Sequence, residues 1–301
     1  MAKAPGFDMR HIGGIIPPMT TPFTAKGEID EAAFRRQARF LIEAGVHGLA
    51  VGGSTGEGHA LEREECRRLI EVAVAEAGGR VPIIAGIIVD STREAIQRGQ
   101  DAKTAGAAAL QITPVHYLFR PDDAHMEEHF RAVGRAVRAP IIIYNVVPWS
   151  YLSPELLVRI MRRVPEVVGV KQSAGDLKLF ADLVQTAPSG TRILSAVDAL
   201  MYPSFALGAH GAVAAILTAA PHASVALWEA VKAGDQRRAL ALHRKLLRLW
   251  NAMVDDNLPA AVKCALTLQG VKGGYPRAPM PPASTRQQKG IARTLKALVP
   301  K

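Results

Sequence analysis

A lysine ends one of the short apolar runs of this chain. Lys171 follows Val167-Val-Gly-Val170, so a buried strand would deliver its amine to the carboxyl end of that strand. Removal from water destabilises an ammonium ion and leaves more of the neutral amine. A neutral amine attacks a ketone to give an iminium, which is an electron sink for breaking an adjacent bond. The position therefore predicts Schiff-base chemistry, with a surface lysine just beyond a strand as the plainer alternative.

A tyrosine ends a second apolar run. Tyr144 closes the segment Ile141-Ile-Ile-Tyr144, where its phenol can carry protons to and from a substrate or a carbinolamine. The alternative is a core tyrosine whose hydroxyl group has a hydrogen-bond partner. Asp198, which follows another predicted strand, is an isolated carboxylate that can line the same pocket.

Residues 52–58 form a glycine-rich turn after a third apolar run. The hydroxyl groups of Ser54 and Thr55, together with the backbone from Gly53 onward, can hold a carboxylate. The turn is not a nucleotide-binding P-loop, because His59 stands where that motif requires lysine. A plain glycine-rich turn is the alternative.

Apolar runs alternate with helical periodicity along most of the chain, which indicates an α/β fold. We predict eight parallel strands buried on both faces, over residues 13–17, 48–51, 82–89, 108–113, 140–145, 167–171, 192–195 and 211–216. Residues 1–234 would form a (β/α)₈ TIM barrel, with a doubly wound open sheet as the weaker alternative. Residues 235–301 would form a C-terminal extension of about three helices packed on the barrel, over 235–255, 259–269 and 284–298.

Bulk composition narrows the function classes. Lysine and arginine give a net charge of +10, but they are dispersed and aromatic residues make up only 5% of the chain, so we do not expect nucleic-acid binding. No apolar run has the length of a membrane span, and the first ten residues lack a signal-peptide core. The two cysteines, Cys66 and Cys264, lack metal-ligand spacing. These features predict a soluble, cytoplasmic protein.

One metal motif occurs by pattern. His125-Met-Glu-Glu-His129 fits the H-x-x-E-H spacing of inverted zincins. It falls within a predicted outer helix, away from the carboxyl ends of the strands where barrel active sites lie. We expect a solvated helical face at this segment and no metal site.

Together these segments resemble the dihydrodipicolinate synthase / N-acetylneuraminate lyase family of class I aldolases. The resemblance covers nearly the whole chain and rests on three motifs in the expected order, which are Gly53-Ser-Thr-Gly-Glu57, Tyr144-Asn145 and Gly169-Val-Lys171-Gln-Ser-Ala-Gly-Asp176. It implies a TIM-barrel lyase that acts on pyruvate or a longer 2-oxo acid, needs no metal or organic cofactor and commonly assembles as a homotetramer.

The resemblance also implies a role for each matching residue. Lys171 corresponds to the Schiff-base lysine and Tyr144 to the proton-relay tyrosine. Ser54 and Thr55 correspond to the pair that binds the keto-acid carboxylate, with Thr55 often in the relay. Gly53, which directly precedes this pair, contributes its backbone to the same substrate-binding turn.

Two segments depart from the synthases of that family. Those enzymes read Tyr-Asn-x-Pro-x-Arg, and the arginine binds the carboxylate of the second substrate, whereas this chain has Trp149 at the arginine position. An indole cannot make that bidentate contact. The segment after the fourth strand is two residues longer than theirs, so either His116 or Tyr117 is a candidate to complete the relay. A pocket containing Trp149, Tyr117 and Phe119 would be more apolar than one built for a second carboxylate.

We therefore expect a lyase, either an aldolase or a dehydratase, whose substrate has a less anionic distal part than aspartate semialdehyde. Dihydrodipicolinate synthase activity is one alternative. A protein that binds a 2-oxo acid without turning it over is another. Metal-dependent barrel chemistry is disfavoured, because the predicted strand ends offer no cluster of histidines and acids.

Overall fold

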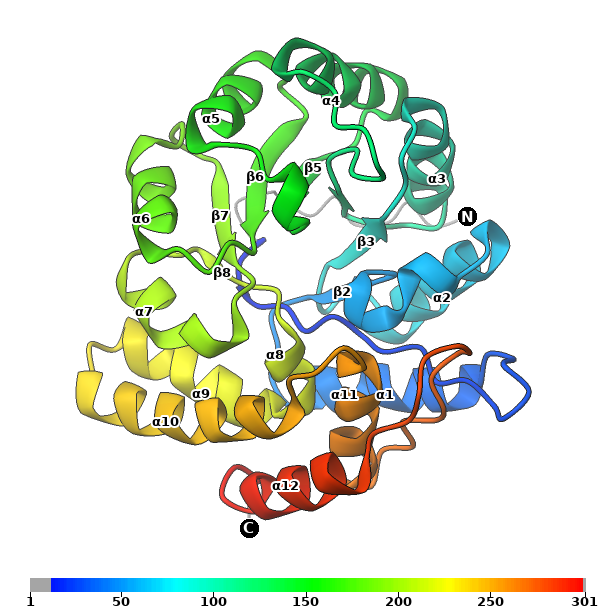
Figure 1. The fold of residues 1–301 in the computed structure, drawn as a ribbon, viewed down its shortest axis with the longest axis vertical. Coiled ribbons are helices and arrows are strands. Elements are labelled where there is room, and N and C mark those ends of the chain that lie inside the picture. The colour runs from blue at the N-terminus through cyan, green and yellow to red at the C-terminus, as the bar shows by residue number, and fades with distance from the viewer. Residues whose placement is uncertain (1–11, 300–301) are drawn as a thin grey trace.

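The strands form a parallel sheet that curls around the centre of the molecule (Figure 1). A computed structural model describes residues 12–299, and within that range eight strands pair in the order β1-β8-β7-β6-β5-β4-β3-β2. The chain just after β1 closes the sheet against β2, because Ala50 N donates to Pro17 O at 3.1 Å and Met19 N donates to Ala50 O at 2.8 Å. The predicted TIM barrel is confirmed, and the doubly wound open sheet is excluded. The strands are β1 Gly14–Ile15, β2 Leu49–Val51, β3 Ile83–Ile87, β4 Ala109–Ile112, β5 Ile141–Asn145, β6 Val167–Gln172, β7 Arg192–Ser195 and β8 Gly211–Ala212.

The helices surround this barrel (Figure 1). Helices α1 to α7 alternate with the strands, as expected when parallel strands need a crossover between them. The three helices predicted after residue 234 are present as α10, α11 and α12, and they pack together on one side of the molecule. The helices are α1 Glu31–Glu43, α2 Arg63–Ala77, α3 Thr92–Thr104, α4 Asp123–Val137, α5 Pro154–Arg163, α6 Leu177–Thr186, α7 Met201–Ala206, α8 Ala215–Ala219, α9 Pro221–Lys232, α10 Gln236–Met253, α11 Leu258–Thr267 and α12 Thr285–Leu295.

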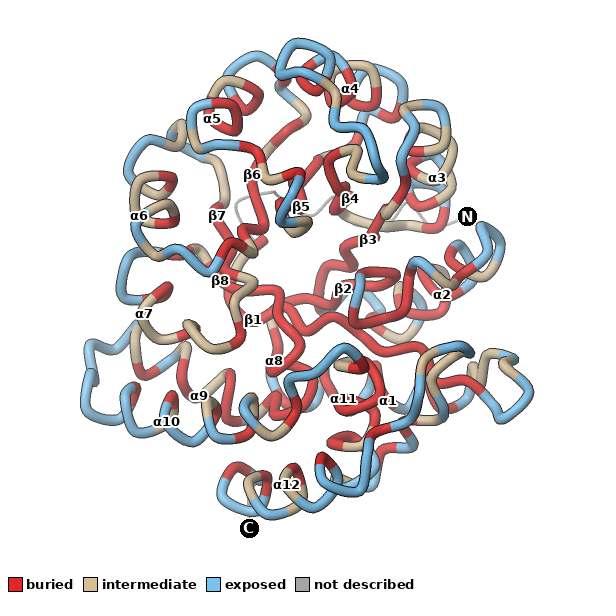
Figure 2. The backbone as a smooth tube through the Cα atoms, in the orientation of Figure 1, coloured by how far each residue is buried: buried red, intermediate tan, exposed pale blue. Residues whose placement is uncertain are grey.

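Two apolar clusters hold the fold together. The larger one fills the layer between the strands and the helices, and Figure 2 shows the strands as a buried centre inside a ring of helices with exposed outer faces. The smaller cluster plugs the barrel interior. It consists of one or two side chains from each contributing strand or its flank, namely Ile12, Ile16, Ala50, Ile84, Ala109, Ile142, Leu194 and Val213. The barrel is therefore a packed core, and polar side chains are left for its rim.

The eighth strand is shorter than predicted. It ends at Ala212, and residues 215–219 of the same apolar run form helix α8. Periodicity cannot separate a buried strand from a short buried helix, and Ala215–Ala219 consists mostly of good helix formers. The helix brings backbone amide groups to the rim of the barrel, where the strand alone would have brought side chains.

Helix α4 also differs from the prediction. His125 is exposed as expected, but Glu127 and His129 are buried. Glu127 accepts hydrogen bonds from Arg131 and Arg159, and a nitrogen of the His129 ring lies 2.9 Å from the hydroxyl of Thr92 on α3. This part of α4 faces α3 and α5 rather than solvent, so the expected solvated face is wrong for these two residues.

Candidate active site

Lys171 and Tyr144 occupy matching places on neighbouring strands. The register of β5 and β6 pairs them directly, and both side chains are 4% exposed. Tyr144 lies two residues beyond Ile142, which belongs to the interior plug, so strand alternation points its ring into the mouth of the barrel. The Lys171 nitrogen lies 3.6 Å from the centre of the Tyr144 ring. The structure thus brings the amine and the phenol together at the carboxyl ends of the strands.

The glycine-rich turn reaches the same point from β2. It folds as two short 3₁₀ segments, Ser54–Gly56 and Gly58–Ala60. The Ser54 hydroxyl lies 3.1 Å from the Tyr144 hydroxyl, within hydrogen-bond distance. Ser54 rather than Thr55 is thus the hydroxyl partner of Tyr144, because successive side chains of a 3₁₀ turn point about 120° apart.

Close packing explains the glycines of this turn. Gly52 has φ +75°, a conformation that side chains disfavour. A Cβ atom on Gly58 would lie 1.9 Å from the Gly52 carbonyl oxygen, and one on Gly86 of β3 would lie 2.6 Å from it. The turn therefore lies directly on β3, and this contact fixes where the Ser54 and Thr55 side chains lie.

A cavity of about 340 Å³ opens above these residues. Lys171, Tyr144, Ser54 and Thr55 all line it. Its further lining consists of His59, Val146, Ser173, Ala196, Asp198, Val213, Ala214, Ala215, Asp256, Leu258, Pro259 and Met280. A polar floor with a mostly apolar wall is the usual construction of a small-molecule site.

Asp198 adds a titratable group to this cavity, as its position after β7 suggested. Burial raises the pKa of its carboxyl group from 3.8 to about 6. The hydrogen bond that Oδ1 accepts from the Ile216 amide at 2.7 Å, and the nearby Lys171 ammonium, act in the opposite direction. A carboxyl group with this pKa is half protonated near pH 6, which is unusual for an aspartate and typical of functional sites.

Three predicted pocket residues lie elsewhere. Trp149 and Tyr117 are 68% and 74% exposed, and neither they nor His116 line the cavity. The Trp149 ring nitrogen donates to the His116 carbonyl oxygen at 2.7 Å, which ties the two loops together at the surface. Phe119 is also exposed. In this single chain the two loops turn outward, because the 3₁₀ turn Pro148–Ser150 and the long β4–α4 segment bond to each other, and the apolar pocket stays a prediction.

The C-terminal extension also contributes to the cavity, which the sequence motifs did not predict. Asp256, Leu258 and Pro259, at the start of α11, line the cavity together with Met280. No spacing rule links these residues to a strand end, since they approach the barrel through the packing of α11 on α8 and on the 3₁₀ segment Ser54–Gly56. Within the described residues, no group of three or more His, Cys, Asp or Glu side chains is arranged to hold a metal ion.

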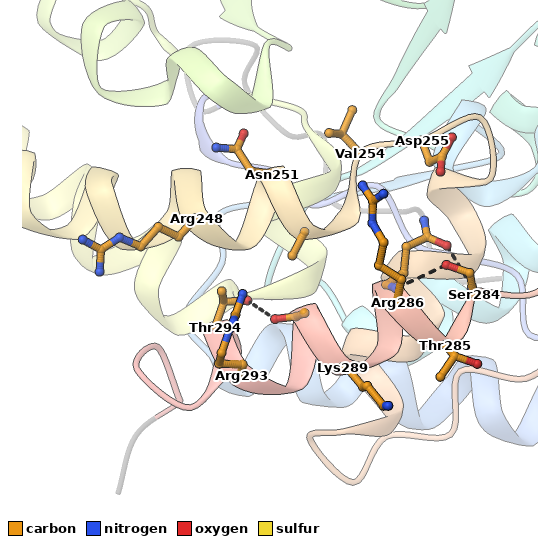
Figure 3. A pocket seen from close by; sticks show the side chains of 13 residues that line it. Arg248, Asn251, Val254, Asp255, Ser284, Thr285, Arg286, Lys289, Arg293 and Thr294 are labelled. Atoms are coloured by element: carbon orange, nitrogen blue, oxygen red, sulfur yellow. Dashed lines mark hydrogen bonds between the residues drawn. The ribbon is translucent and has the colours of Figure 1, made fainter.

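A larger hollow of about 840 Å³ lies between α10 and α12. Arg248, Arg286, Lys289 and Arg293 are among its lining residues (Figure 3). Figure 3 shows Arg248 and Lys289 pointing in different directions. Arg248 and Lys289 do not converge, and the described residues that line the hollow include no lysine beside a tyrosine like the pair in the smaller cavity.

Comparison with known proteins agrees with the fold and the motifs. Residues 11–298 match the family model described as the dihydrodipicolinate synthetase family. The chain belongs to this family. It is therefore an enzyme of the class I lyase type, and like its relatives it acts on small molecules.

Individual relatives span almost the whole chain. A 4-hydroxy-tetrahydrodipicolinate synthase of Methanopyrus kandleri is 38% identical over 291 residues, covering 95% of this chain and 96% of the relative. A crystal structure of a putative dihydrodipicolinate synthetase from Pseudomonas aeruginosa superposes with a TM-score of 0.91 at 32% identity, over 96% of this chain and 100% of that one. A prophage protein of this family from E. coli K12, solved in complex with pyruvate, gives a TM-score of 0.90 at 27% identity, over 95% and 98% of the two chains.

Proposed function

We propose that this enzyme condenses the Lys171 amine with pyruvate or a longer 2-oxo acid. The observation that carries the proposal is that Lys171 is 4% exposed, with its nitrogen 3.6 Å from the Tyr144 ring centre at the floor of the cavity. The amine forms a bond to C2 of the 2-oxo acid, and the ketone oxygen leaves as water once it has received protons. Loss of a proton from C3 then gives an enamine, the common intermediate of aldol chemistry and dehydration.

Ser54, Thr55 and Tyr144 complete the proposed chemistry. The hydroxyl and backbone groups of Ser54 and Thr55, on the turn that starts at Gly53, bind the substrate carboxylate. Tyr144 moves protons to and from the carbinolamine oxygen, with the Ser54 hydroxyl at 3.1 Å as its partner. This pairing supports Ser54, rather than Thr55, as the second member of the relay. In the cavity, Asp198 is able to donate a hydrogen bond when the pH is below its pKa of about 6, where its carboxyl group is protonated.

The cavity lining supports a second substrate without a second carboxylate. Lys171 is the only lysine among the described residues that line the cavity, and there is no arginine among them. Asp256, together with Asp198 when the pH is above its pKa of about 6, adds negative charge to the wall. A carboxylate brought against them would be repelled, so we propose that the distal part of the substrate is less anionic than aspartate semialdehyde. Trp149, which replaces the family's arginine, lies outside the cavity.

A second candidate function is 4-hydroxy-tetrahydrodipicolinate synthesis. It is favoured by the names of relatives such as the Methanopyrus kandleri enzyme, which is 38% identical over nearly the whole chain. Turnover of pyruvate with aspartate semialdehyde decides between the two candidates. Efficient turnover would establish the synthase and refute the less anionic substrate.

Trapping the imine tests the shared first step. Treatment with pyruvate and borohydride is expected to attach the reduced adduct to Lys171, seen by peptide mapping and mass spectrometry. The Lys171→Arg variant should give no adduct, because a guanidinium group does not condense with a ketone under these conditions. Lys178→Arg, at an exposed lysine of α6, is the matched control and should be labelled as fully as the wild type.

The same experiment addresses a purely binding role. If Lys171 stays unmodified with pyruvate and with longer 2-oxo acids, the Schiff-base proposal is refuted and a binding protein is the remaining interpretation.

Within the described residues, no helix is long and apolar enough to cross a membrane. Cys66 and Cys264 are free thiols, which supports the proposal that the enzyme works in a reducing compartment such as the cytoplasm.

A further inference from the structure

The carboxylate-binding turn contains a buried acid that the proposed chemistry does not use. Glu57 joins the two 3₁₀ segments of the turn in the left-handed conformation, with φ 57° and ψ 35°. Residues with a Cβ atom disfavour this conformation, and glycine or asparagine usually occupies it. Glu57 is 1% exposed and does not line the cavity. Something other than local preference must hold it there.

Two groups of the C-terminal extension hold the Glu57 carboxylate. Lys263 of α11, itself 2% exposed, donates from Nζ to Oε1 at 2.5 Å. The backbone amide of Arg277 donates to Oε2 at 2.8 Å. Both partners lie more than two hundred positions further along the chain. The side chain of Glu57 is therefore held by the last part of the chain, not by its own neighbours.

Glu57 provides the carboxylate that pairs with the buried Lys263 ammonium group. Its ammonium group also donates to the Tyr275 carbonyl oxygen at 2.7 Å and lies 4.8 Å from the centre of the Phe23 ring. Burial lowers the pKa of Lys263, and Glu57 acts in the opposite direction. Removing two charges from water is costly, and hydrophobic replacements of such pairs are often as stable, so a pair of this kind is better explained by a demand for geometry than by stability.

The ion pair affects the backbone around Ser54 and Thr55, the two residues proposed to bind the substrate carboxylate. The Glu57 amide donates to the Ser54 carbonyl oxygen at 3.1 Å, so the position of Glu57 determines how tightly the first 3₁₀ segment closes. Thr21 holds the carbonyl group at the end of this segment, because its hydroxyl donates to Gly56 O at 2.8 Å. Ser54 and Thr55 lie inside this frame.

We propose that the Glu57–Lys263 ion pair positions the Ser54–Thr55 turn to bind the carboxylate of the 2-oxo acid. Both are positioning residues, since neither lines the cavity. The inference rests on the proposed function for the identity of the ligand. It assigns the C-terminal extension a part in substrate binding, through α11.

The test measures how imine trapping at Lys171 depends on pyruvate concentration. In Glu57→Gln and in Lys263→Met, the half-saturating pyruvate concentration is expected to rise about tenfold, because the carboxylate-binding groups are displaced. The trapping rate at saturating pyruvate should stay close to that of the wild type, since Lys171 and Tyr144 are untouched. If a single variant fails to fold around its unpaired charge, Glu57→Gln/Lys263→Met, which leaves no unpaired ion, gives the same comparison.

Glu127→Gln is the matched control. Glu127 is also a buried carboxylate in ion pairs, with Arg131 and Arg159, but it lies on the outer helix α4. Its loss should lower stability without changing the half-saturating concentration. Equal effects of Glu57→Gln and Glu127→Gln on that concentration would overturn the inference.

A second measurement separates this inference from the proposed function. If the wild type forms no adduct with any 2-oxo acid, the Schiff-base proposal fails, and deuterium exchange of a peptide covering residues 53–58 then decides the inference. Faster exchange in Glu57→Gln than in Glu127→Gln supports anchoring of the turn. Equal exchange in the two variants overturns it.

Discussion

At the scale of single residues, the cavity combines a buried amine with a buried carboxyl group. Asp198 lies near enough to Lys171 for the ammonium charge to lower its pKa, yet burial dominates and the pKa rises to about 6. Burial of an ionised carboxylate lowers the stability of the folded state compared with a neutral side chain. Buried carboxyl groups of this kind therefore occur mainly at functional sites. The carboxyl group therefore opposes folding once it is charged.

Asp198→Asn is predicted to stabilise the protein in a pH-dependent way. The folded-state pKa lies above the ordinary value of 3.8, so the folded state binds the proton more tightly, and the stability of the wild type falls as the pH rises through about 6. Asparagine lacks this charge. The free energy of unfolding of the variant, relative to the wild type, should grow by about 2 kcal/mol between pH 4 and pH 7.

Thermal or urea unfolding of both proteins across this pH range measures the difference. Groups other than Asp198 contribute equally to both proteins and cancel. A difference that does not vary with pH would show that Asp198 titrates normally in the folded state.

At the scale of elements, helix α4 contacts α3 through a buried histidine whose neutral form is favoured. His129 is 4% exposed, and burial lowers its pKa from 6.5 to about 4. Its ring lies against Phe130 and the hydroxyl of Thr92 on α3. The contact between α3 and α4 is therefore sensitive to acid.

His129→Gln is predicted to show the opposite pH dependence. Because the folded-state pKa is below 6.5, the stabilisation from neutral His129 is present above that pH and is lost as the pH falls toward about 4. Between pH 7 and pH 5 the wild type should lose about 2 kcal/mol that the variant does not lose. Unfolding curves of the two proteins at both pH values provide the measurement, and a constant gap between them would contradict the prediction.

At the scale of the whole molecule, an apolar surface patch is left without a partner in this single chain. We call Tyr117, Leu118, Phe119 and Trp149 the rim patch; each is at least 68% exposed. Adjacent exposed aromatic side chains of this kind mark protein interfaces. The homotetramer implied by family resemblance remains a prediction, and the rim patch is where we expect neighbouring chains to meet.

Light scattering is expected to give four times the chain mass of 32.2 kDa. Phe119→Asp should yield a smaller species, because a carboxylate in an apolar interface loses its hydration without gaining a partner. Leu268→Asp, at an exposed leucine after α11, is the control and should leave the mass unchanged. If Phe119→Asp also keeps the wild-type mass, the rim patch is not an assembly surface.

The sequence predicted the barrel because each strand is a local apolar run and each helix carries its own periodicity. The predicted strand ends of Tyr144 and Lys171 were enough to bring them together, since parallel neighbours in register place matching residues side by side. The boundary predicted at residue 234 falls in the turn between α9 and α10. The predicted bounds of the eighth strand were wrong, because one apolar run contains both a strand and a helix.

Local pattern thus determined the alternation of elements, the Schiff-base lysine candidate and the turn of Ser54 and Thr55. Only the tertiary structure decided which loops face the cavity: it left Trp149 and Tyr117 at the surface and brought Asp256, Met280 and the Lys263–Glu57 pair to the site or its support. The physical reason is the sequence separation between the residues that interact. Strands and helices follow from neighbours a few residues apart, whereas a loop or an ion pair joining residues 57 and 263 depends on how whole layers pack.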